Sequence, residues 1–319
     1  MTGRSLAEEL RAAEALLAGA GVPSPRVDAE LLAAHLMGAV TGATVSRGQV
    51  QAAAILGRPA PDGLAELVAR RAAREPLQHL TGLAPFRGLE LAVGPGVFVP
   101  RPETEQVAEV AIAEAHAVAA RAGSVLVADL CTGSGAIALA LAHEVPGAVV
   151  HAVELDRVAH DWAARNVAAS GLDVRLVRGD ARTALGELDG TLDVVVSNPP
   201  YVPPGAVPVD PEVAQHDPAV ALYGLGRDGL EVPRGIAAAA ARLLRPGGLF
   251  VMEHAEVQAA AALDLVRSTG GFDDVRTCAD LTGRPRMVVA RRTLDASAVP
   301  TPSGSGEPAR ADVVGDSHA

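Results

Sequence analysis

The sequence predicts an α/β fold in which a largely parallel sheet is covered by helices on both faces. Three observations lead to this prediction. Hydrophobic residues make up 49% of the chain but aromatic residues only 2%, so Ala, Val and Leu build a core that suits a sheet buried on both sides. An apolar strand, a glycine turn and an apolar helix follow one another over residues 124–142. From there on, four successive predicted strands end in residues typical of ligand sites.

Residues 1–75 are expected to form a small helical bundle. Helical periodicity is present over 6–17, 25–37 and 63–73, with breaks between these stretches. The charged first residues lack the apolar core of a signal peptide, and no apolar run is long enough to span a bilayer. Cys131 and Cys278 are the only cysteines, which argues against a disulfide scaffold. These features predict a cytoplasmic protein that does not bind a membrane.

Residues 76–100 are expected to form a β-hairpin linker. Strand-like stretches cover 86–93 and 97–99, and Gly94, Pro95 and Gly96 separate them. The prolines at 100 and 102 are then expected to begin a helix that runs to about residue 120, because proline suits the first turn of a helix.

Residues 101–293 are expected to hold the sheet, with seven strands in total. After the strand that begins near residue 124, the predicted strands lie at 148–154, 174–177, 192–197, 248–253, 274–278 and 287–290. A helix is expected to separate the strands at 248–253 and 274–278. Residues 294–319 are rich in Thr, Ser, Pro, Gly and Ala and poor in large apolar residues, which predicts a disordered tail.

The turn after the first of these strands is expected to bind a nucleotide-like cofactor. Gly133 and Gly135 let the backbone approach a ligand closely, and the helix start offers free N–H groups. The next strand ends in Glu154, 19 positions after Gly135 and close to the offset of ~20 residues at which a carboxylate binds ribose hydroxyls. Asp180 follows the third strand, where an acid can meet an adenine amino group. Two simpler interpretations stay open: the glycines only form a turn, and Asp180 only caps the next segment.

The fourth strand, 192–197, leads into a motif that suits a planar NH2 acceptor: Asn198, Pro199, Pro200 and Tyr201. A conjugated NH2 group attacks a methyl donor poorly unless both N–H bonds are held and the nitrogen is aimed. The Asn198 side-chain oxygen and the Pro199 carbonyl are two fixed acceptors, and the Tyr201 ring can pack on the flat group. Catalysis would then depend on orientation, without a metal or a strong base. The simpler interpretation is a turn that ends the strand.

S-adenosylmethionine fits these two motifs better than NAD does. The glycine spacing differs from the Gly-x-Gly-x-x-Gly fingerprint of dinucleotide sites. The acceptor motif at 198–201 also has no feature suited to hydride transfer.

With these residues assembled, the sequence resembles the HemK/PrmC family of peptide chain release factor N5-glutamine methyltransferases. The resemblance covers nearly all of residues 5–293. Besides the acceptor motif it includes Arg74 to Gly82, Phe86, Gly88 and Val97 to Glu105. The seven predicted strands and the break at 270–272 also match the seven-stranded, Rossmann-like sheet of class I methyltransferases.

The resemblance implies that the methyl group passes from S-adenosylmethionine to the glutamine amide in the Gly-Gly-Gln motif of class 1 release factors, giving N5-methylglutamine. It implies that the helical bundle helps to recognise the release factor. It assigns the glutamine to 198–201, with Arg101 and Glu103 where the linker closes over the site. The cofactor residues that it implies are Cys131, Thr132, Gly133, Ser134, Gly135, Glu154, Asp180, Ala181 and Asn198.

Several positions depart from the commoner family pattern. Cys131 stands where glycine is frequent, and we expect the turn to survive because a buried Cys is small. Ala181 stands where some relatives carry an aromatic residue that can stack on adenine. Glu253, His254 and Ala255 replace a Glu-x-Gly sequence, which is expected to shift the backbone slightly.

The net charge of −11 weakens the nearest enzymatic alternative, methylation of the adenine amino group in nucleic acid. That reaction needs a basic groove and an extruded base. Glutamine methylation of a ribosomal protein is a second alternative, and the stretch 100–105 favours the release factor branch. A protein that binds without turnover is a third, and Asn198 and Tyr201 argue against it.

The remaining expectations concern partners and loops. We expect a monomer with no direct nucleic acid contact and no metal, since the nine histidines are scattered along the chain. The segment that follows Tyr201, up to residue 228, is rich in Pro and Gly and is expected to cover the substrate glutamine as a lid.

Overall fold

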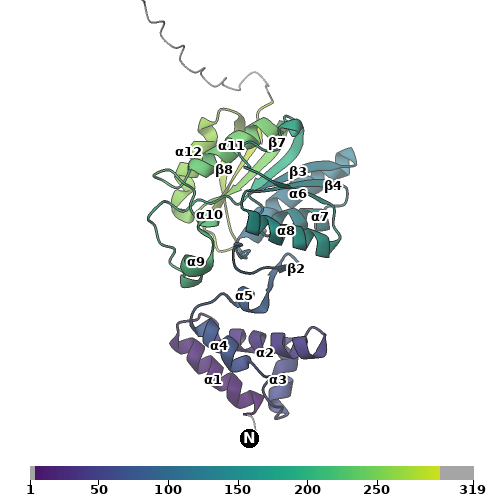
Figure 1. Cartoon of the computed structure of the whole chain (residues 1–319). Helices are drawn as coiled ribbons and strands as arrows, with labels where there is room; N and C mark the ends of the chain where they lie inside the picture. The colour runs from purple at the N-terminus through teal and green to yellow at the C-terminus, as the bar shows by residue number, and fades with distance from the viewer. Residues whose placement is uncertain (1–3, 295–319) are drawn as a thin grey trace, which may run out of the picture.

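The computed structural model describes residues 4–294, and Figure 1 shows a helical part and a larger α/β part joined by a short linker. The predicted disordered tail lies outside the described residues, except for Leu294, as do residues 1–3. None of the helices in the described range has both the length and the apolar character that a membrane span requires.

The N-terminal part consists of four helices: α1 (Leu6–Gly19), α2 (Pro25–Thr41), α3 (Arg47–Ile55) and α4 (Leu64–Ala72). Their aliphatic side chains meet in a buried core of their own, to which Leu80 of the linker also belongs. Ser5 and Ser46 begin α1 and α3, each as part of a capping box. Helix α3 is absent from the sequence prediction because Val50 is its one buried residue, so it has no apolar stripe.

The linker holds a short helix and a hairpin: α5 (Leu77–Thr81), β1 (Leu83–Phe86) and β2 (Leu89–Ala92). The hairpin itself is confirmed, but the strand positions predicted at 86–93 and 97–99 are wrong. Its turn lies at Arg87 and Gly88, which have φ of 46° and 77°. Residues 97–99 form no strand.

Gly94 and Gly96 serve close packing and not the hairpin turn. A Cβ on Gly94 would lie 2.6 Å from the Trp162 ring, and one on Gly96 would lie 2.6 Å from the Val158 side chain. Both partners belong to helix α8 (Arg157–Ser170). The two glycines therefore let the linker lie directly on α8, which explains why their sequence signal was misleading.

The sheet has seven strands in the order β5-β4-β3-β6-β7-β9-β8, and only β9 runs antiparallel to the other six. The strands are β3 (Val125–Leu130), β4 (Ala148–Glu154), β5 (Val174–Arg178), β6 (Leu192–Ser197), β7 (Leu244–Glu253), β8 (Phe272–Ala279) and β9 (Pro285–Arg292). This confirms the predicted α/β class and its seven strands. The strand order reverses between β3 and β6, and ligands bind at such a point in open α/β sheets.

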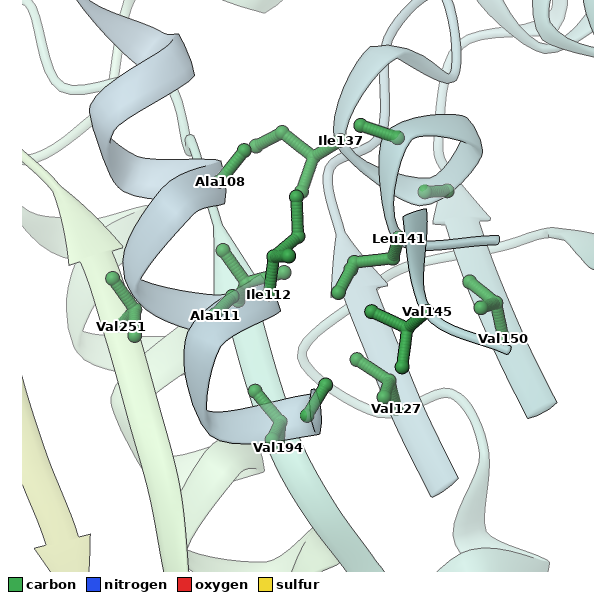
Figure 2. Close-up of a cluster of buried hydrophobic side chains, with 14 of the residues drawn as sticks. Ala108, Ala111, Ile112, Val127, Ile137, Leu141, Val145, Val150, Val194 and Val251 are labelled. Atoms are coloured by element: carbon green, nitrogen blue, oxygen red, sulfur yellow. The ribbon is translucent and has the colours of Figure 1, made fainter. Parts of the chain in front are cut away.

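Helices cover both faces of the sheet, as predicted. Helices α6 (Thr104–Ala122) and α7 (Ala136–Glu144) cover one face, and α11 (Glu231–Leu243) and α12 (Ala259–Ser268) cover the other. Figure 2 shows Ile112 and Leu141 of the first pair above Val127, Val194 and Val251 of the strands. The small aliphatic core thus forms as the composition predicts.

Residues 202–228, which we call the lid segment, are partly helical, and the chain near residues 222–224 comes back beside Val202. The segment contains α9 (Pro211–His216) and α10 (Ala219–Leu222). The Val202 N–H donates to the Leu222 carbonyl at 2.8 Å, and the Gly224 N–H donates to the Val202 carbonyl at 3.1 Å. In Figure 1, α9 lies on the side of the α/β part that faces the N-terminal helices.

Candidate active site

A cavity of about 950 Å³ opens at the carboxyl edge of the sheet, where β3 and β6 lie side by side. The predicted cofactor residues in its wall are Cys131, Thr132, Gly133, Ser134, Glu154, Asp180 and Ala181. The acceptor motif 198–201, Arg101 and Glu103 line it as well. Gly135 lies behind the wall, where a Cβ would meet the Leu139 side chain at 3.4 Å. One site therefore brings together all but one of the residues that the sequence singled out.

The loop between β3 and α7 has a left-handed backbone at three residues. Cys131, Gly133 and Gly135 have φ of 65°, 59° and 88°. Glycine adopts this conformation freely, whereas a residue with a Cβ does so at a cost of roughly 1–2 kcal/mol. The turn therefore forms with Cys131 in it, but under strain. Burial raises the pKa of the Cys131 thiol, so this group is neutral and contributes packing.

Asp129, at the end of β3, organises the loop from within the protein. Its buried Oδ2 accepts hydrogen bonds from the Thr132 hydroxyl at 2.6 Å and from the Ala138 N–H at 3.1 Å. Burial raises the pKa of Asp129 to about 7, and these two hydrogen bonds oppose the rise. Asp129 fixes both the loop and the start of α7. The sequence interpretation missed this role, although an acid directly before a glycine loop is a visible signal.

Glu154, the predicted ribose ligand, ends β4 beside the glycine loop. Its Oε2 accepts the Gly133 N–H and its Oε1 accepts the Asp156 N–H, both at 2.8 Å. Burial raises the pKa of Glu154, and these backbone donors oppose the rise. Each oxygen keeps a lone pair for a further donor. The position and acceptor capacity of Glu154 match what a pair of ribose hydroxyls needs.

Asp180, the predicted adenine ligand, is engaged by its neighbour Arg182. The Arg182 guanidinium donates to both carboxylate oxygens at 2.7 to 3.0 Å, and its backbone N–H donates to Oδ1 at 2.9 Å. These hydrogen bonds lower the pKa of Asp180. The contacts favour the capping interpretation, and the adenine role stays a prediction. Ala181, buried next to it, offers a small apolar wall without a ring.

Asn198 and Pro199 each present a carbonyl oxygen without a partner at the end of β6. The Asn198 side-chain nitrogen donates to the Thr104 hydroxyl at 3.4 Å, which directs the amide oxygen away from Thr104. Among residues 4–294, no hydrogen bond reaches Asn198 Oδ1 or the Pro199 carbonyl. Two acceptors on consecutive residues are thus available to the two N–H bonds of a planar amine.

Tyr201 is fixed at its ring and at its backbone. Its hydroxyl donates to Glu253 Oε1 at 3.3 Å, and its carbonyl accepts from the Gln258 side chain at 2.8 Å. Burial raises the pKa of the Tyr201 phenol, so the ring is neutral. Glu253 ends β7 in a buried position, where burial raises its pKa to about 7 against the opposing effect of the Thr104 hydroxyl. The ring of Tyr201 therefore forms a rigid part of the cavity wall.

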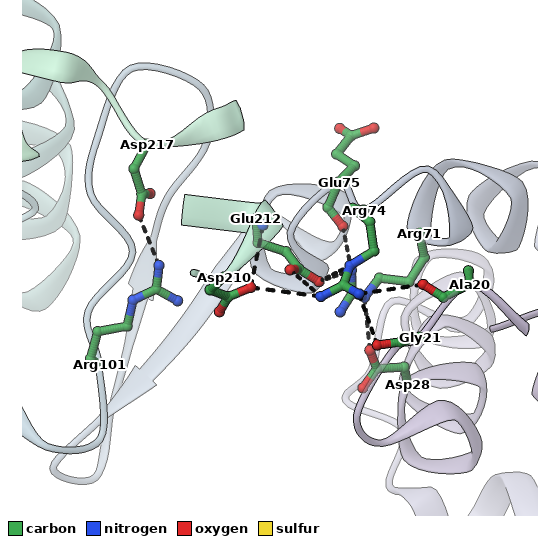
Figure 3. Close-up of polar contacts among 10 residues, drawn as sticks. All are labelled: Ala20, Gly21, Asp28, Arg71, Arg74, Glu75, Arg101, Asp210, Glu212 and Asp217. Atoms are coloured by element: carbon green, nitrogen blue, oxygen red, sulfur yellow. Dashed lines mark hydrogen bonds and ion pairs between the residues drawn. The ribbon is translucent and has the colours of Figure 1, made fainter. Parts of the chain in front are cut away.

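Arg101 closes the cavity by holding the lid segment. Its guanidinium donates to Asp217 at 2.8 Å and lies 5.2 Å from the centre of the Phe98 ring. Figure 3 shows this contact beside a larger ionic cluster. The Asp217 side chain is fully buried, which raises its pKa, and Arg101 opposes the rise. Arg101 is thus anchored to the lid, whereas Glu103 is exposed at the cavity wall.

Thr104 and Asn166 position the site without a visible sequence signal. Asn166 of α8 donates to the Ser134 carbonyl at 2.9 Å and to the Ala92 carbonyl at 3.0 Å, which ties the hairpin to the glycine loop. Thr104 begins α6 and meets Asn198, 94 residues later. Each is a single polar residue on a helix whose partners lie far away in the sequence, so only the fold reveals its role.

The residues around the cavity fit a cofactor that contains an adenosine. Glu154 offers a fixed carboxylate to ribose hydroxyls, and Gly133 allows close approach of the backbone without a Cβ. Ala181 and Ile137 supply an apolar wall that can receive a flat base.

Comparison with known proteins decides the family. Residues 8–82 match the family described as the PrmC N-terminal domain, and residues 104–216 match the methyltransferase small domain. The release factor glutamine methyltransferase of Streptomyces coelicolor is 51% identical over 296 residues, which cover 91% of this chain and 99% of that protein. The chain belongs to the release factor glutamine methyltransferase family. The resemblance predicted from the sequence motifs is therefore confirmed.

Two further relatives are named for different acceptors. The release factor glutamine methyltransferase of Mycolicibacterium smegmatis is 49% identical over 89% of this chain and 96% of that protein. A 4-amino-L-phenylalanine/4-methylamino-L-phenylalanine methyltransferase of Streptomyces pristinaespiralis is 42% identical over 86% of this chain and 93% of that protein. Among solved structures, a methyltransferase from Pyrococcus furiosus matches 65% of this chain and 90% of its own, with a TM-score of 0.48 and 20% identity. Glutamine and 4-amino-L-phenylalanine, which these two names contain, both carry an NH2 group conjugated to a carbonyl or a ring, and 4-methylamino-L-phenylalanine is the singly methylated aryl amine.

Proposed function

We propose that this protein methylates the side-chain amide of the glutamine in the Gly-Gly-Gln motif of class 1 release factors, giving N5-methylglutamine. The observation that carries the proposal is the pair of free acceptors, Asn198 Oδ1 and the Pro199 carbonyl, in one cavity with Glu154. Relatives at about half identity over most of both chains carry this activity in their names.

The mechanism depends on orientation. S-adenosylmethionine, when bound, supplies a methyl group made reactive by a positively charged sulfur. Asn198 and Pro199 hold the two N–H bonds of the acceptor amide, and Tyr201 packs against its flat face, so the nitrogen lone pair is aimed at the methyl carbon. The nitrogen then loses one proton to water. Glu154 would hold the ribose hydroxyls of the cofactor, and the lid segment would cover the acceptor glutamine.

The release factor itself would dock beside the lid segment. Val207 and Val209 line the cavity while 76% and 100% exposed, and Val257 lies at the same cavity while 95% exposed. Such exposed apolar side chains suit a loop of a partner protein better than a charged nucleic acid backbone does. A monomeric state stays a prediction.

A comparison of acceptors tests the proposal. Radiolabelled methyl transfer is measured with a purified class 1 release factor, with free 4-amino-L-phenylalanine and with adenine-containing DNA, under the same conditions. We expect transfer to the release factor alone. Transfer to the aryl amine alone would contradict the proposal and would move the assignment to the second kind of relative.

A further inference from the structure

A chain of buried polar contacts joins Asn198 to Tyr201 behind the acceptor wall. The Asn198 side-chain nitrogen donates to the Thr104 hydroxyl at 3.4 Å. The Thr104 hydroxyl acts in turn on the Glu253 carboxyl, whose pKa it lowers, and the Tyr201 hydroxyl donates to Glu253 Oε1 at 3.3 Å. Thr104 and Glu253 are 4% and 3% exposed, so water does not replace these partners. The chain starts and ends at the two residues proposed to hold the acceptor.

The direction of the hydrogen bonds follows from the carboxylate. Above about pH 7, where Glu253 is ionised, its carboxylate only accepts hydrogen bonds, so the Thr104 hydroxyl can act on it only as a donor. The lone pairs of Thr104 Oγ1 then face Asn198, and only the NH2 end of the Asn198 amide can satisfy them. The amide oxygen of Asn198 is thereby turned to the cavity. With the opposite amide orientation, Asn198 would present N–H groups to the N–H bonds of the substrate.

The contacts of Glu253 do not explain its burial by a contribution to stability. Its Oε2 is buried without a hydrogen-bond partner among the described residues, and the nearby Arg286 guanidinium is bound to Asp280 at 3.1 and 3.2 Å. A buried carboxyl group that lacks a full set of partners lowers stability. A position of this kind is expected where function requires it.

We propose that Thr104 and Glu253 are positioning residues that fix the Asn198 amide with its oxygen toward the acceptor NH2 group. The inference rests on the proposed function, because it concerns the oxygen that holds the acceptor. It applies equally to a glutamine amide and to an aryl amine, since both present the same planar NH2 group.

Two substitutions at Thr104 separate the hydroxyl from the shape of the side chain. Thr104→Val keeps the shape and removes the hydroxyl, and Thr104→Ser keeps the hydroxyl in a smaller side chain. The kcat is measured for the acceptor that the wild type methylates, together with the Kd for S-adenosylmethionine by calorimetry and the melting temperature. We expect kcat to fall about tenfold in Thr104→Val, as for the loss of one buried hydrogen bond, and to stay within about threefold in Thr104→Ser. The cofactor Kd is expected to be unchanged in both.

The kcat of a double variant distinguishes a positioning role from a merely structural one. Because Thr104 and Glu253 act through the same amide, Thr104→Val combined with Glu253→Gln is expected to lower kcat no further than the more severe single variant does. Equal kcat in Thr104→Val and Thr104→Ser, or kcat losses that multiply in the double variant, would overturn the positioning role while the wild type still methylates the release factor. A folded wild type that methylates neither acceptor would overturn the proposed function as well.

Discussion

Arg74, at the end of the N-terminal helices, binds Glu212 of the lid segment across 138 residues of sequence. Its guanidinium donates to the two carboxylate oxygens at 2.8 and 2.5 Å. Arg71 reaches the same carboxylate at 2.7 Å and also binds Asp28 at 2.8 Å, as Figure 3 shows. The Glu212 side chain is only 8% exposed. The helical part is therefore joined to the lid directly and not only through the linker.

Arg74→Ala is expected to loosen the lid. Although burial acts to raise the pKa of Glu212, the hydrogen bonds from Arg74 and Arg71 outweigh it, so its pKa lies below its usual range. Without Arg74, the buried carboxylate loses a charged partner at a cost of about 1–3 kcal/mol. We expect a higher KM for the release factor and a lower melting temperature, with the cofactor Kd unchanged. Steady-state kinetics and calorimetry measure these quantities.

Arg70→Ala is the matched control for this prediction. Arg70 binds Glu75 within the same region, its side chain is 46% exposed, and it makes no hydrogen bond or ion pair with the lid segment. The charge change is the same, but an exposed pair contributes at most about 1 kcal/mol. Equal KM values for the two variants would show that the contact between Arg74 and Glu212 does not matter for substrate binding.

Gly229→Ala is expected to disturb the acceptor motif. A Cβ on Gly229 would lie 2.5 Å from the Tyr201 carbonyl oxygen and 2.6 Å from the Pro203 nitrogen, and backbone atoms cannot give way easily. We expect kcat to fall at least tenfold. Gly205→Ala, in the lid segment, has a similar positive φ of 83° but open space around its Cβ, so it reports the backbone strain alone. The prediction fails if the two variants have the same kcat.

Glu253→Gln is expected to gain stability at high pH while it loses activity. Burial raises the pKa of Glu253 from 4.5 to about 7, against the opposing effects of Thr104, Arg286 and Tyr201, and Glu103 adds to the rise. Between these values the folded state keeps a proton that the unfolded state has released. The free energy of unfolding therefore falls as pH rises through this window, by on the order of 3 kcal/mol, and the loss is complete above about pH 7.

Urea unfolding at pH 5 and at pH 8 measures this effect. The neighbouring His254, whose pKa is lowered by burial, is present in both proteins, so the difference between them isolates Glu253. Glu253→Gln is expected to exceed the wild type in stability at pH 8 by more than at pH 5. An equal stability difference at the two pH values would contradict the raised pKa.

Cys131→Val is expected to disrupt the glycine loop, whereas Cys131→Gly is not. The φ of 65° at Cys131 is strained for any residue with a Cβ and worst for a β-branched side chain. We expect Cys131→Val to lower the melting temperature and to raise the cofactor Kd at least tenfold. Cys131→Gly is expected to bind the cofactor as the wild type does. A Cys131→Val variant with wild-type cofactor affinity would show that the loop tolerates another backbone conformation.

Local sequence patterns predicted the sheet well. The central strands β3, β4 and β6 are short, mostly apolar runs, and polar residues such as Glu154 and Asn198 lie at their carboxyl ends. The edge of the sheet that forms the cavity could therefore be predicted from the sequence. The position of the hairpin turn was predicted wrongly because a glycine can be required either by a turn or by close packing. Gly94 and Gly96 looked like a turn, but they allow close contact with Trp162 and Val158.

The positioning residues could not be predicted because their partners are distant in sequence. Thr104 is an ordinary polar residue at a helix start until the fold brings it to Asn198, and Arg74 lies in a motif that gives no sign of Glu212. Arg101 lines the cavity where the linker was expected to close over the site, but its partner Asp217 in the lid segment could not be predicted. Such pairings depend on how separate elements are packed, which periodicity and spacing do not encode.

The central claim is that the acceptor nitrogen is held by Asn198, and tandem mass spectrometry tests it most directly. A purified class 1 release factor is incubated with S-adenosylmethionine and either the wild type or Asn198→Ala, and the peptide that carries the Gly-Gly-Gln motif is sequenced. We expect one added methyl group on the glutamine with the wild type and at least a hundredfold less with Asn198→Ala, although the variant stays folded and binds the cofactor. Equal methylation by both proteins, or a methyl group on another residue, would contradict the account.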